Sequence, residues 1–281
     1  MKKTRYYIVA LLLAVASLSV QAQNKELSYY DWVDKSAQFI DQNRLDSAAY
    51  SLQQAMKLEP ANANNSMLLL NLGILQRQLR HTGDAYVSLT AALANSSEPV
   101  LVLHNRASLL CDMNQFDDAM DDYSAIIKID PDNVEAYYRR GLLHLEANDR
   151  TSAEADFEKC DEIDANNLFS KLSKALLLKL EDDWEGAEKI YSDILATESR
   201  KHNSYYMNRA ECYVNIEKYS LAAADLRTIE AGERENPYFY ILRGRVRLNQ
   251  FDKFAAKADF ENAKKLGYDE ELANKWIEKT K

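Results

Sequence analysis

Residues 134–167 read VEAYYRRGLLHLEANDRTSAEADFEKCDEIDANN, a stretch of 34 residues whose pattern recurs along most of the chain. Within it, Ala153 is followed four residues later by the bulky apolar Phe157. The same alanine returns at intervals of 37, 34, 34, 34, 35 and 34 residues, at Ala48, Ala85, Ala119, Ala153, Ala187, Ala222 and Ala256. Self-similarity at this period indicates an array of repeated supersecondary units.

Each repeat can be numbered from 1 to 34, with the recurrent alanine at position 20. Small residues then occupy position 8, namely Ser36, Gly73, Ala107, Gly141, Ala175, Ala210 and Gly244. The larger apolar residues at positions 24 and 27 lie on the same helical face as position 20, one and two turns further along. The pattern therefore predicts a helix, a tight turn and a second helix in every repeat, with Asn148-Asp149 and Gly83-Asp84 at turns.

This register resembles the tetratricopeptide repeat: small residues at 8 and 20, an aromatic residue or leucine at 24, and Pro60 and Pro131 at position 32. The segment Asn133 to Gly141, NVEAYYRRG, is especially similar to the first helix of that repeat. The resemblance implies an all-α fold, a right-handed superhelical solenoid of about seven helix-turn-helix repeats, with a role in binding other proteins.

The expected organisation follows from the register. We expect a signal peptide over 1–22, a lead-in over 23–28, and a capping helix over 269–281 that begins after Asp269 and presents Leu272, Trp276 and Ile277 to the last repeat. We expect no cap before the first repeat. The seven repeats within 29–268 are expected at 29–62, 66–99, 100–133, 134–167, 168–202, 203–236 and 237–268.

The N-terminus has the features of an export signal. Lys2, Lys3 and Arg5 precede an apolar run over 8–16, and Val20 and Ala22 supply small residues before Gln23. We expect cleavage near Ala22-Gln23 and a periplasmic or secreted protein, in a bacterial envelope. The alternative is an uncleaved anchor, but the apolar run is short for a membrane of about 30 Å. No later segment predicts membrane insertion.

The acidic composition limits the classes of molecule that the chain is expected to bind. Removing the three basic residues of the signal leaves 32 basic against 44 acidic residues, which argues against nucleic acid or an anionic lipid surface as a ligand. Cys111, Cys160 and Cys212 are far apart, and Cys160 replaces Ala or Ile at position 27. We interpret Cys160 as an apolar filler and expect no structural disulfide.

A paired pattern connects positions 7 and 23. Arginine occupies position 7 in the same four repeats that have aspartate at 23, and the other three repeats lack both. Because a guanidinium suits a carboxylate bidentately, we predict the intra-repeat pairs Arg106–Asp122, Arg140–Asp156, Arg209–Asp225 and Arg243–Asp259. The alternative is shared ancestry of the repeats with both groups solvated.

The chain shows no catalytic constellation. It has no Gly-rich phosphate loop, nucleophile elbow or His-Glu-x-x-His motif, so we expect neither an enzyme nor a bound cofactor or metal. The acidic run over 117–122 lacks the glycine and terminal glutamate of a calcium loop and is interpreted as a solvated helix face. His144 is expected to be packed, whereas His104 would face the binding groove.

In the family that the chain resembles, first helices line a concave groove whose wall comes from positions 2, 5, 9, 12 and 13. This wall is strongly apolar here and has Tyr, Phe and Met, residues common at protein contact sites. We expect a partner to contact Tyr30, Met67, Leu70, Leu101, His104, Tyr138, Phe169, Met207 and Tyr238. The alternative is that many of them pack between neighbouring repeats.

Chaperone adaptors of this family grip a C-terminal carboxylate with basic and Asn side chains at set positions. Asn105 and Arg139 match that pattern, but Leu70, Ile74 and Glu135 occupy the other three places. We therefore expect an apolar helix or an extended segment as the guest, bound by a non-catalytic scaffold or adaptor. The alternative is a homo-oligomer that self-assembles through its uncapped first repeat.

Overall fold

The structure is a computed structural model that describes residues 26–281. The predicted signal peptide and the first half of the lead-in, residues 23–25, lie outside the described residues. Within the described part the chain is all α, as predicted, with fifteen helices and no strand. The helices are α2 (Tyr29–Asp41), α3 (Leu45–Leu58), α4 (Asn65–Gln78), α5 (Thr82–Leu93), α6 (Pro99–Asp112), α7 (Phe116–Ile129), α8 (Val134–Glu146), α9 (Arg150–Asp164), α10 (Leu168–Leu180), α11 (Trp184–Thr197), α12 (Asn203–Asn215), α13 (Tyr219–Ile229), α14 (Pro237–Asn249), α15 (Lys253–Lys265) and α16 (Glu270–Glu278).

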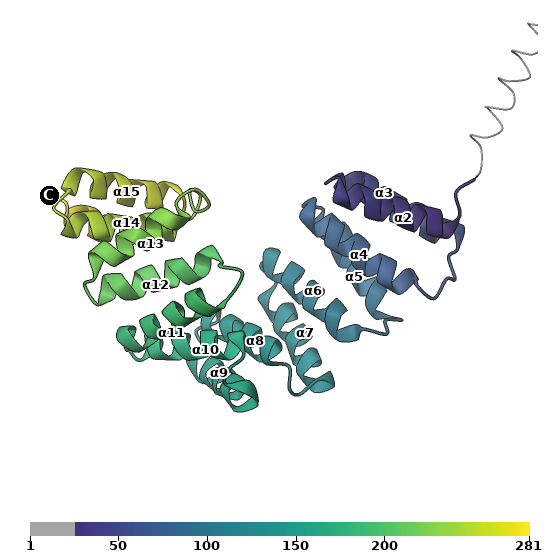
Figure 1. Cartoon of the computed structure of the whole chain (residues 1–281), viewed down its shortest axis with the longest axis horizontal. Coiled ribbons are helices and arrows are strands. Elements are labelled where there is room, and N and C mark those ends of the chain that lie inside the picture. Colours follow the sequence, from purple (N-terminus) through teal and green to yellow (C-terminus); the bar gives the residue numbers. More distant parts are fainter. Residues whose placement is uncertain (1–25) are drawn as a thin grey trace, which may run out of the picture. The chain divides into compact units, whose positions relative to one another are not determined.

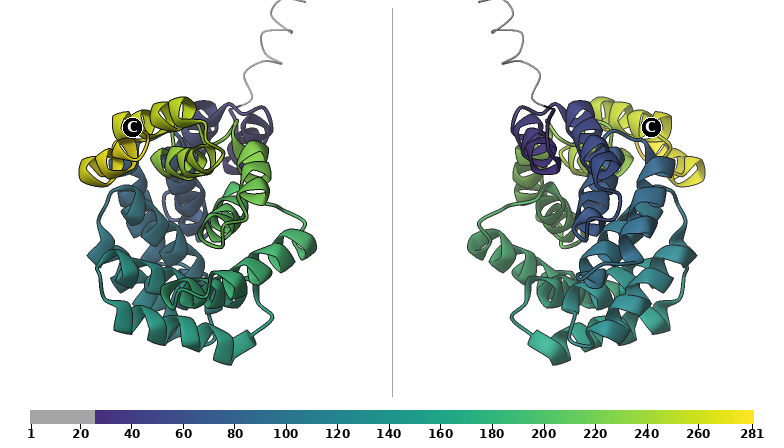
Figure 2. Two further views of the ribbon diagram at one scale, coloured as in Figure 1. Left: turned by 90° about the vertical axis from the view of Figure 1, so that its left-hand side faces the viewer. Right: turned by 90° about the vertical axis from the view of Figure 1, so that its right-hand side faces the viewer.

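The helices divide into two compact units. The described residues up to Asp130 form unit 1, which contains α2 to α7, and Pro131 to Lys281 form unit 2, which contains α8 to α16. In each unit the first and second helix of a repeat form a hairpin, and the hairpins stack in chain order (Figures 1 and 2). Within unit 1, α3 packs on α4 and α5 on α6; within unit 2, α9 packs on α10, α11 on α12, α13 on α14 and α15 on α16.

The recurrent positions form the core of every hairpin. All seven alanines at position 20 are fully buried, and every residue at positions 24 and 27 is at most 3% exposed. A side chain on Gly141 would overlap the ring of Phe157, and Gly244 stands in the same relation to Phe260. Glycine at position 8 therefore makes room for phenylalanine at position 24, because the two helices approach too closely for both side chains.

The turn inside each repeat has one conformation in all seven copies. Its residue at position 15 has a positive φ of 56° to 64°, at Asn43, Arg80, Asn114, Asn148, Asp182, Glu217 and Phe251. The next amide donates to a carbonyl five residues back, for example Asp149 N to His144 O at 2.8 Å, as expected for this helix ending. One predicted turn was misplaced: Gly83 and Asp84 lie inside α5, and the turn is at Arg80.

The capping helix α16 follows the last repeat. Asp269 is its N-cap, and its carboxylate accepts a hydrogen bond of 2.8 Å from the amide of Leu272. The ring of Trp276 stacks on Phe260, with 5.7 Å between centroids. The predicted apolar stripe is corrected at one place: Leu272 is 45% exposed, and Ala273 is the fully buried residue of this helix.

Candidate protein-binding surface

The four arginine–aspartate pairs lie inside their hairpins. In three of them, the arginine Nε and Nη2 atoms donate to the two carboxylate oxygens over 2.6–2.9 Å: Arg106–Asp122, Arg140–Asp156 and Arg209–Asp225. In Arg243–Asp259 the same atoms donate over 2.8–3.2 Å. The four aspartates are only 1–5% exposed. Each buried carboxylate therefore needs the charge and the hydrogen bonds of its arginine to replace those of water.

The bidentate contact further stabilises the charged form of the arginine. The hydrogen bond that each guanidinium donates to its aspartate raises the pKa of Arg106, Arg140 and Arg209 above the ordinary value. The position 7 and 23 pattern therefore corresponds to charged, partly buried pairs rather than to two solvated groups.

Arginine at position 7 also contacts the preceding repeat. The Nη1 atom of Arg106 donates a hydrogen bond of 3.3 Å to Thr90, and that of Arg209 donates one of 3.2 Å to Ser192. The Nη1 atom of Arg243 donates one of 2.6 Å to Glu230. One guanidinium thus joins the two helices of its own repeat to the second helix of the repeat before it. Sequence reasoning missed this link, although the polar residues at positions 25 and 28 could have indicated it.

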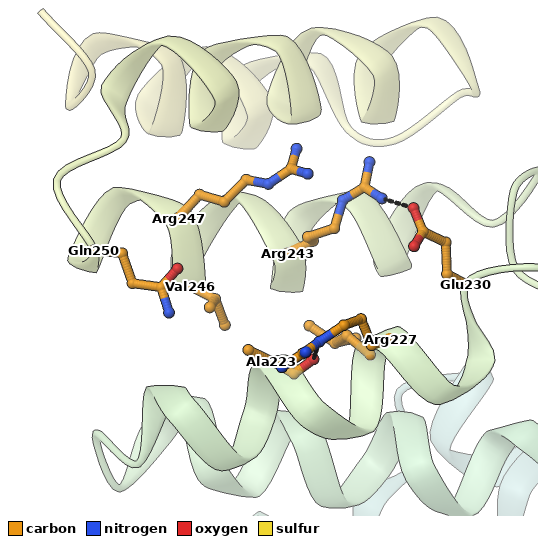
Figure 3. A pocket seen from close by; sticks show the side chains of 8 residues that line it. Ala223, Arg227, Glu230, Arg243, Val246, Arg247 and Gln250 are labelled. Carbon is orange, nitrogen blue, oxygen red and sulfur yellow. Dashed lines mark hydrogen bonds and ion pairs between the residues drawn. The ribbon is translucent and has the colours of Figure 1, made fainter.

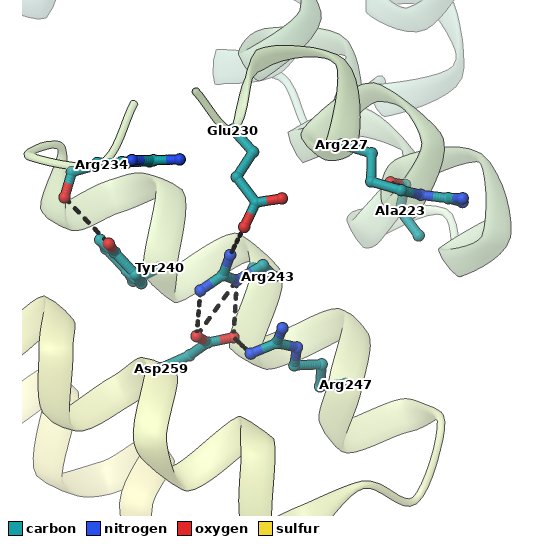
Figure 4. Close-up of polar contacts among 8 residues, drawn as sticks. All are labelled: Ala223, Arg227, Glu230, Arg234, Tyr240, Arg243, Arg247 and Asp259. Carbon is teal, nitrogen blue, oxygen red and sulfur yellow. Dashed lines mark hydrogen bonds and ion pairs between the residues drawn. The ribbon is translucent and has the colours of Figure 1, made fainter. Parts of the chain in front are cut away.

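The last repeat extends its pair into a cluster. Asp259 accepts hydrogen bonds from both Arg243 and Arg247, and Arg243 also reaches Glu230 (Figure 4). The arginines line a cavity of about 190 Å³ between α13 and α14, with Arg227 across from them (Figure 3). Because Asp259 and Glu230 already neutralise Arg243 and Arg247, this cluster is primarily a structural joint between the last two repeats.

The predicted contact residues at position 5 lie in the stack. Leu70 and Met207 are 2% and 7% exposed, so a partner cannot contact their side chains on the surface. Tyr138 packs between Phe157 and Phe169, with centroid distances of 6.2 and 5.4 Å, and burial raises its pKa to about 12. His104 is half-buried at the same position. Position 5 therefore contributes to the core, because it packs against the second helix of its own repeat and, at Leu70 and Tyr138, against the next hairpin as well.

Position 2 behaves differently in unit 1. Tyr30, Met67 and Leu101 are 62%, 39% and 46% exposed, and they lie on the first helices α2, α4 and α6. All three belong to the predicted contact set. Met67 lies only three residues before the buried Leu70, so one turn of α4 presents both an accessible and a buried apolar residue. We call Tyr30, Met67 and Leu101 the unit 1 wall.

The equivalent face of unit 2 is more polar than predicted. Lys179 on α10 donates to Glu211 and Asn208 on α12 over 2.5 and 2.9 Å. Tyr238 on α14 donates its hydroxyl proton to Glu211 over 2.6 Å, and burial together with the Glu211 charge raises the tyrosine pKa. Phe169 is half-buried. The wall is therefore less apolar in unit 2 than expected, because residues at positions 2, 6, 9 and 12 form this polar network.

The C-terminal end of unit 2 has an open cavity of about 370 Å³. Its lining comes from positions 9, 12 and 13 of the last repeat, the first residue of α13, the turn before α15, and the C-terminal end of the capping helix α16. Arg245 reaches across to Asn215 with a hydrogen bond of 2.9 Å. We call this space the end pocket.

Among residues 26–281, no group of three or more His, Cys, Asp or Glu side chains is arranged to hold a metal ion. Cys160 and Cys212 are fully buried, and burial raises the pKa of both thiols, that of Cys212 to about 12. In the acidic run, Asp122 pairs with Arg106 while Asp117, Asp118 and Asp121 are exposed. In the same part of the chain, no helix is long and apolar enough to span a membrane.

Comparisons with known proteins agree with this geometry. A family model described as "TPR repeat" matches residues 107–147, and one described as "Tetratricopeptide repeat" matches residues 134–167. The chain is 35% identical over 83 residues to the heat shock protein STI1 of Saccharomyces cerevisiae, and 24% identical over 178 residues to a DnaJ homolog subfamily C member 7 homolog of Dictyostelium discoideum. These matches cover 29% and 58% of this chain, but only 14% and 32% of the relatives.

A solved structure matches along almost the whole length. The crystal structure of a tetratricopeptide repeat protein from Parabacteroides merdae has 32% sequence identity to this chain and a TM-score of 0.68, and the match covers 90% of this chain and 98% of that one. The repeat register, the stacked hairpins and this relative together show that the chain belongs to the tetratricopeptide repeat family.

Proposed function

We propose that this protein is a non-catalytic scaffold of the bacterial cell envelope that binds a segment of another protein along its first helices. Proteins with tetratricopeptide repeats generally mediate protein–protein interactions, and this supports the general role. The unit 1 wall carries the finer proposal. Tyr30, Met67 and Leu101 recur at one repeat position and stay 39–62% exposed, although Leu70, one turn after Met67, is buried. Aligned, exposed apolar side chains are typical of contact sites.

The wall suits an apolar guest. Its three members come from successive first helices, so their spacing follows the stacking of the hairpins rather than one helix. An amphipathic helix or an extended segment can place apolar side chains at such intervals. The family's carboxylate grip is incomplete here, because Leu70 is buried and Glu135 forms an ion pair with Arg139 over 3.0 Å.

Photo-crosslinking in the native envelope tests this proposal. Photo-reactive residues at Tyr30 and Leu101 should capture the same partner, whereas one at Val87 should not. Val87 is a suitable control because it is 67% exposed but lies on the second helix α5. Equal capture from all three positions, or capture from Val87 alone, would refute the proposed wall.

The proposed location rests on the N-terminal pattern. Basic residues, an apolar run and small residues before Gln23 support export and cleavage. The Parabacteroides relative supports a bacterial origin. Mass spectrometry of the protein from its native cells should find a mature N-terminus at Gln23 in the envelope fraction. An intact Met1 in the cytoplasmic fraction would contradict this part of the proposal.

Self-association is the second candidate, and one feature favours it. Trp32, Phe39 and Tyr50 on the first repeat line an open cavity of about 340 Å³, and Tyr50 is 55% exposed. In repeats three, six and seven, arginine at position 7 contacts the preceding second helix, whereas repeat one has Lys35 there, over the Trp32 ring at 5.1 Å. Light scattering at two protein concentrations tests this candidate: a constant monomer mass would eliminate it.

A further inference from the structure

Two phenylalanines at the C-terminal end are almost completely exposed. Phe251, in the turn before α15, is 91% exposed, and Phe254, in the first turn of α15, is 88% exposed. An isolated exposed apolar residue is ordinary, but two phenylalanines three residues apart that bury so little contribute almost nothing to the fold. Their presence suggests that another molecule covers them.

Phe251 is also unfavourable for its own turn. It has φ 63°, in the left-handed region, where a side chain other than that of Gly, Asn or Asp is disfavoured. The equivalent residue is polar in each of the other six repeats: Asn43, Arg80, Asn114, Asn148, Asp182 and Glu217. Phe251 therefore combines an unfavourable backbone conformation with negligible burial, a combination that stability does not explain.

Phe251 forms part of the end pocket. Tyr219, Leu248 and Trp276 supply the other apolar parts of its lining. The ring of Trp276 is already held by its stacking on Phe260, with 25° between the ring planes. A guest side chain would thus meet a preorganised aromatic surface, which reduces the entropy lost on binding.

The charge of the end pocket is opposite to that of the chain. The guanidinium carbon of Arg245 lies 5.2 Å from the Trp276 ring centroid, and Lys279 Nζ lies 4.0 Å from it. Among residues 26–281, no carboxylate lines the pocket, although the chain as a whole has a net charge of −9. The neighbouring Asp252 caps α15 by accepting a hydrogen bond of 3.0 Å from the amide of Ala255. The pocket therefore favours an acidic partner.

We propose that the end pocket binds an internal acidic segment of a partner protein. An apolar side chain of that segment lies between Phe251 and Trp276, and its carboxylates face Arg245 and Lys279. The site rests on the proposed scaffold function and deepens it by naming the chemistry of the partner. It is separate from the unit 1 wall, so each site can fail without the other.

A random peptide library displayed on phage, selected on the full chain, tests the site. Enriched sequences should contain Asp or Glu around an aromatic or aliphatic residue. The best peptide, synthesised with both termini blocked, is then measured by fluorescence anisotropy. We expect Lys279→Glu and Phe251→Gly each to weaken its binding about tenfold or more. Affinity should also fall as the salt concentration rises.

Phe251→Gly separates binding from folding. Glycine accepts the positive φ without strain, so this variant should melt at a higher temperature than the parent while it loses affinity. Arg80→Gly is the matched control, because Arg80 has φ 64° in an equivalent turn of unit 1. It should also gain stability, yet bind the peptide as the parent does.

Several outcomes would overturn the proposed site. They are selection of basic peptides, selection of none, and peptide binding that both Lys279→Glu and Phe251→Gly leave unchanged. A concentration-dependent increase in mass that Phe251→Gly abolishes, without peptide selection, would assign the pocket to a second copy of this chain and overturn the proposal. None of these results affects crosslinking from Tyr30 and Leu101, which tests the scaffold function independently.

Discussion

Gly141→Ala should destabilise the protein, although alanine is the better helix former. Gly141 is buried in α8, and a Cβ added there would lie 2.5 Å from Cε1 and 2.8 Å from Cδ1 of Phe157. Non-bonded carbon atoms prefer about 3.5–4.0 Å, so the ring would have to move by roughly 1 Å. Phe157 is fully buried and contacts Tyr138, which leaves it little room to move.

Two opposing contributions set the magnitude. Replacing glycine inside a helix by alanine stabilises by about 0.5–1 kcal/mol. Overpacking a filled core destabilises by about 1–3 kcal/mol. The steric contribution should dominate because the obstacle is a rigid ring in the core rather than a flexible side chain. We expect a net loss of about 1–2 kcal/mol in the free energy of unfolding.

Urea denaturation followed by far-UV circular dichroism measures this loss. The control is Gly83→Ala in α5, where an added Cβ would meet nothing within 4 Å. That variant should gain about 0.5 kcal/mol. Gly141→Ala should cost less in a Phe157→Leu background, because the double-mutant cycle then removes the obstructing ring. Stabilisation by both glycine substitutions would refute the reasoning.

Three further predictions concern the last repeats and the buried thiols. Asp259→Asn should cost about 2–3 kcal/mol in urea denaturation, because two arginines lose their charged acceptor. Glu271→Gln, which removes the charge of the exposed Glu271–Lys275 pair, should change the stability by no more than about 0.5 kcal/mol. Equal costs for the two variants would contradict the buried-pair interpretation. Cys212 should resist iodoacetamide at pH 8.5 until urea unfolds the chain, because burial raises its pKa to about 12 and keeps it protonated. Rapid native labelling of Cys212 would show that this site opens. Trp276→Ala should accelerate hydrogen exchange in α15 while α8 keeps its protection, since the Trp276 ring covers Phe260; unchanged exchange in α15 would mean that α16 is not a cap.

The same raised thiol pKa gives a pH dependence with a definite sign. Between about pH 9 and pH 12 the unfolded chain ionises Cys212, whereas the folded chain does not. Stability from this group is therefore complete below pH 9 and falls as the pH rises through that range. Cys212→Ala should reduce this alkaline loss in urea denaturation at matched pH values. An identical loss in the variant would assign it to other groups.

The contacts inside each hairpin could be predicted because they join residues that are close in the sequence. Ala153 and Phe157 lie one helical turn apart, so their shared face follows from helix geometry alone. The pairing of Arg140 with Asp156 was also accessible, since both positions recur together and lie on adjacent helices of one repeat. Such local relations depend little on how one repeat meets the next.

The candidate binding surfaces were less predictable for a related reason. Met67 and Leu70 are both apolar residues of one helix, yet stacking of the neighbouring hairpin buries only Leu70. In the second repeat, the turn was predicted at Gly83 because glycine is common in turns, but the residue with the positive φ is Arg80. There the required backbone conformation is imposed by the hairpin on whatever residue occupies the position.

The sequence by itself determined the repeat, its register, the core positions and the intra-repeat ion pairs, because helical periodicity and a fixed repeat length place those residues together. Only the tertiary structure decided which apolar residues stay accessible, how the arginines link adjacent repeats, and that Phe251 and Trp276 border one pocket. Those outcomes depend on which helices pack against each other, and side chains far apart in the chain then compete for the same buried surface.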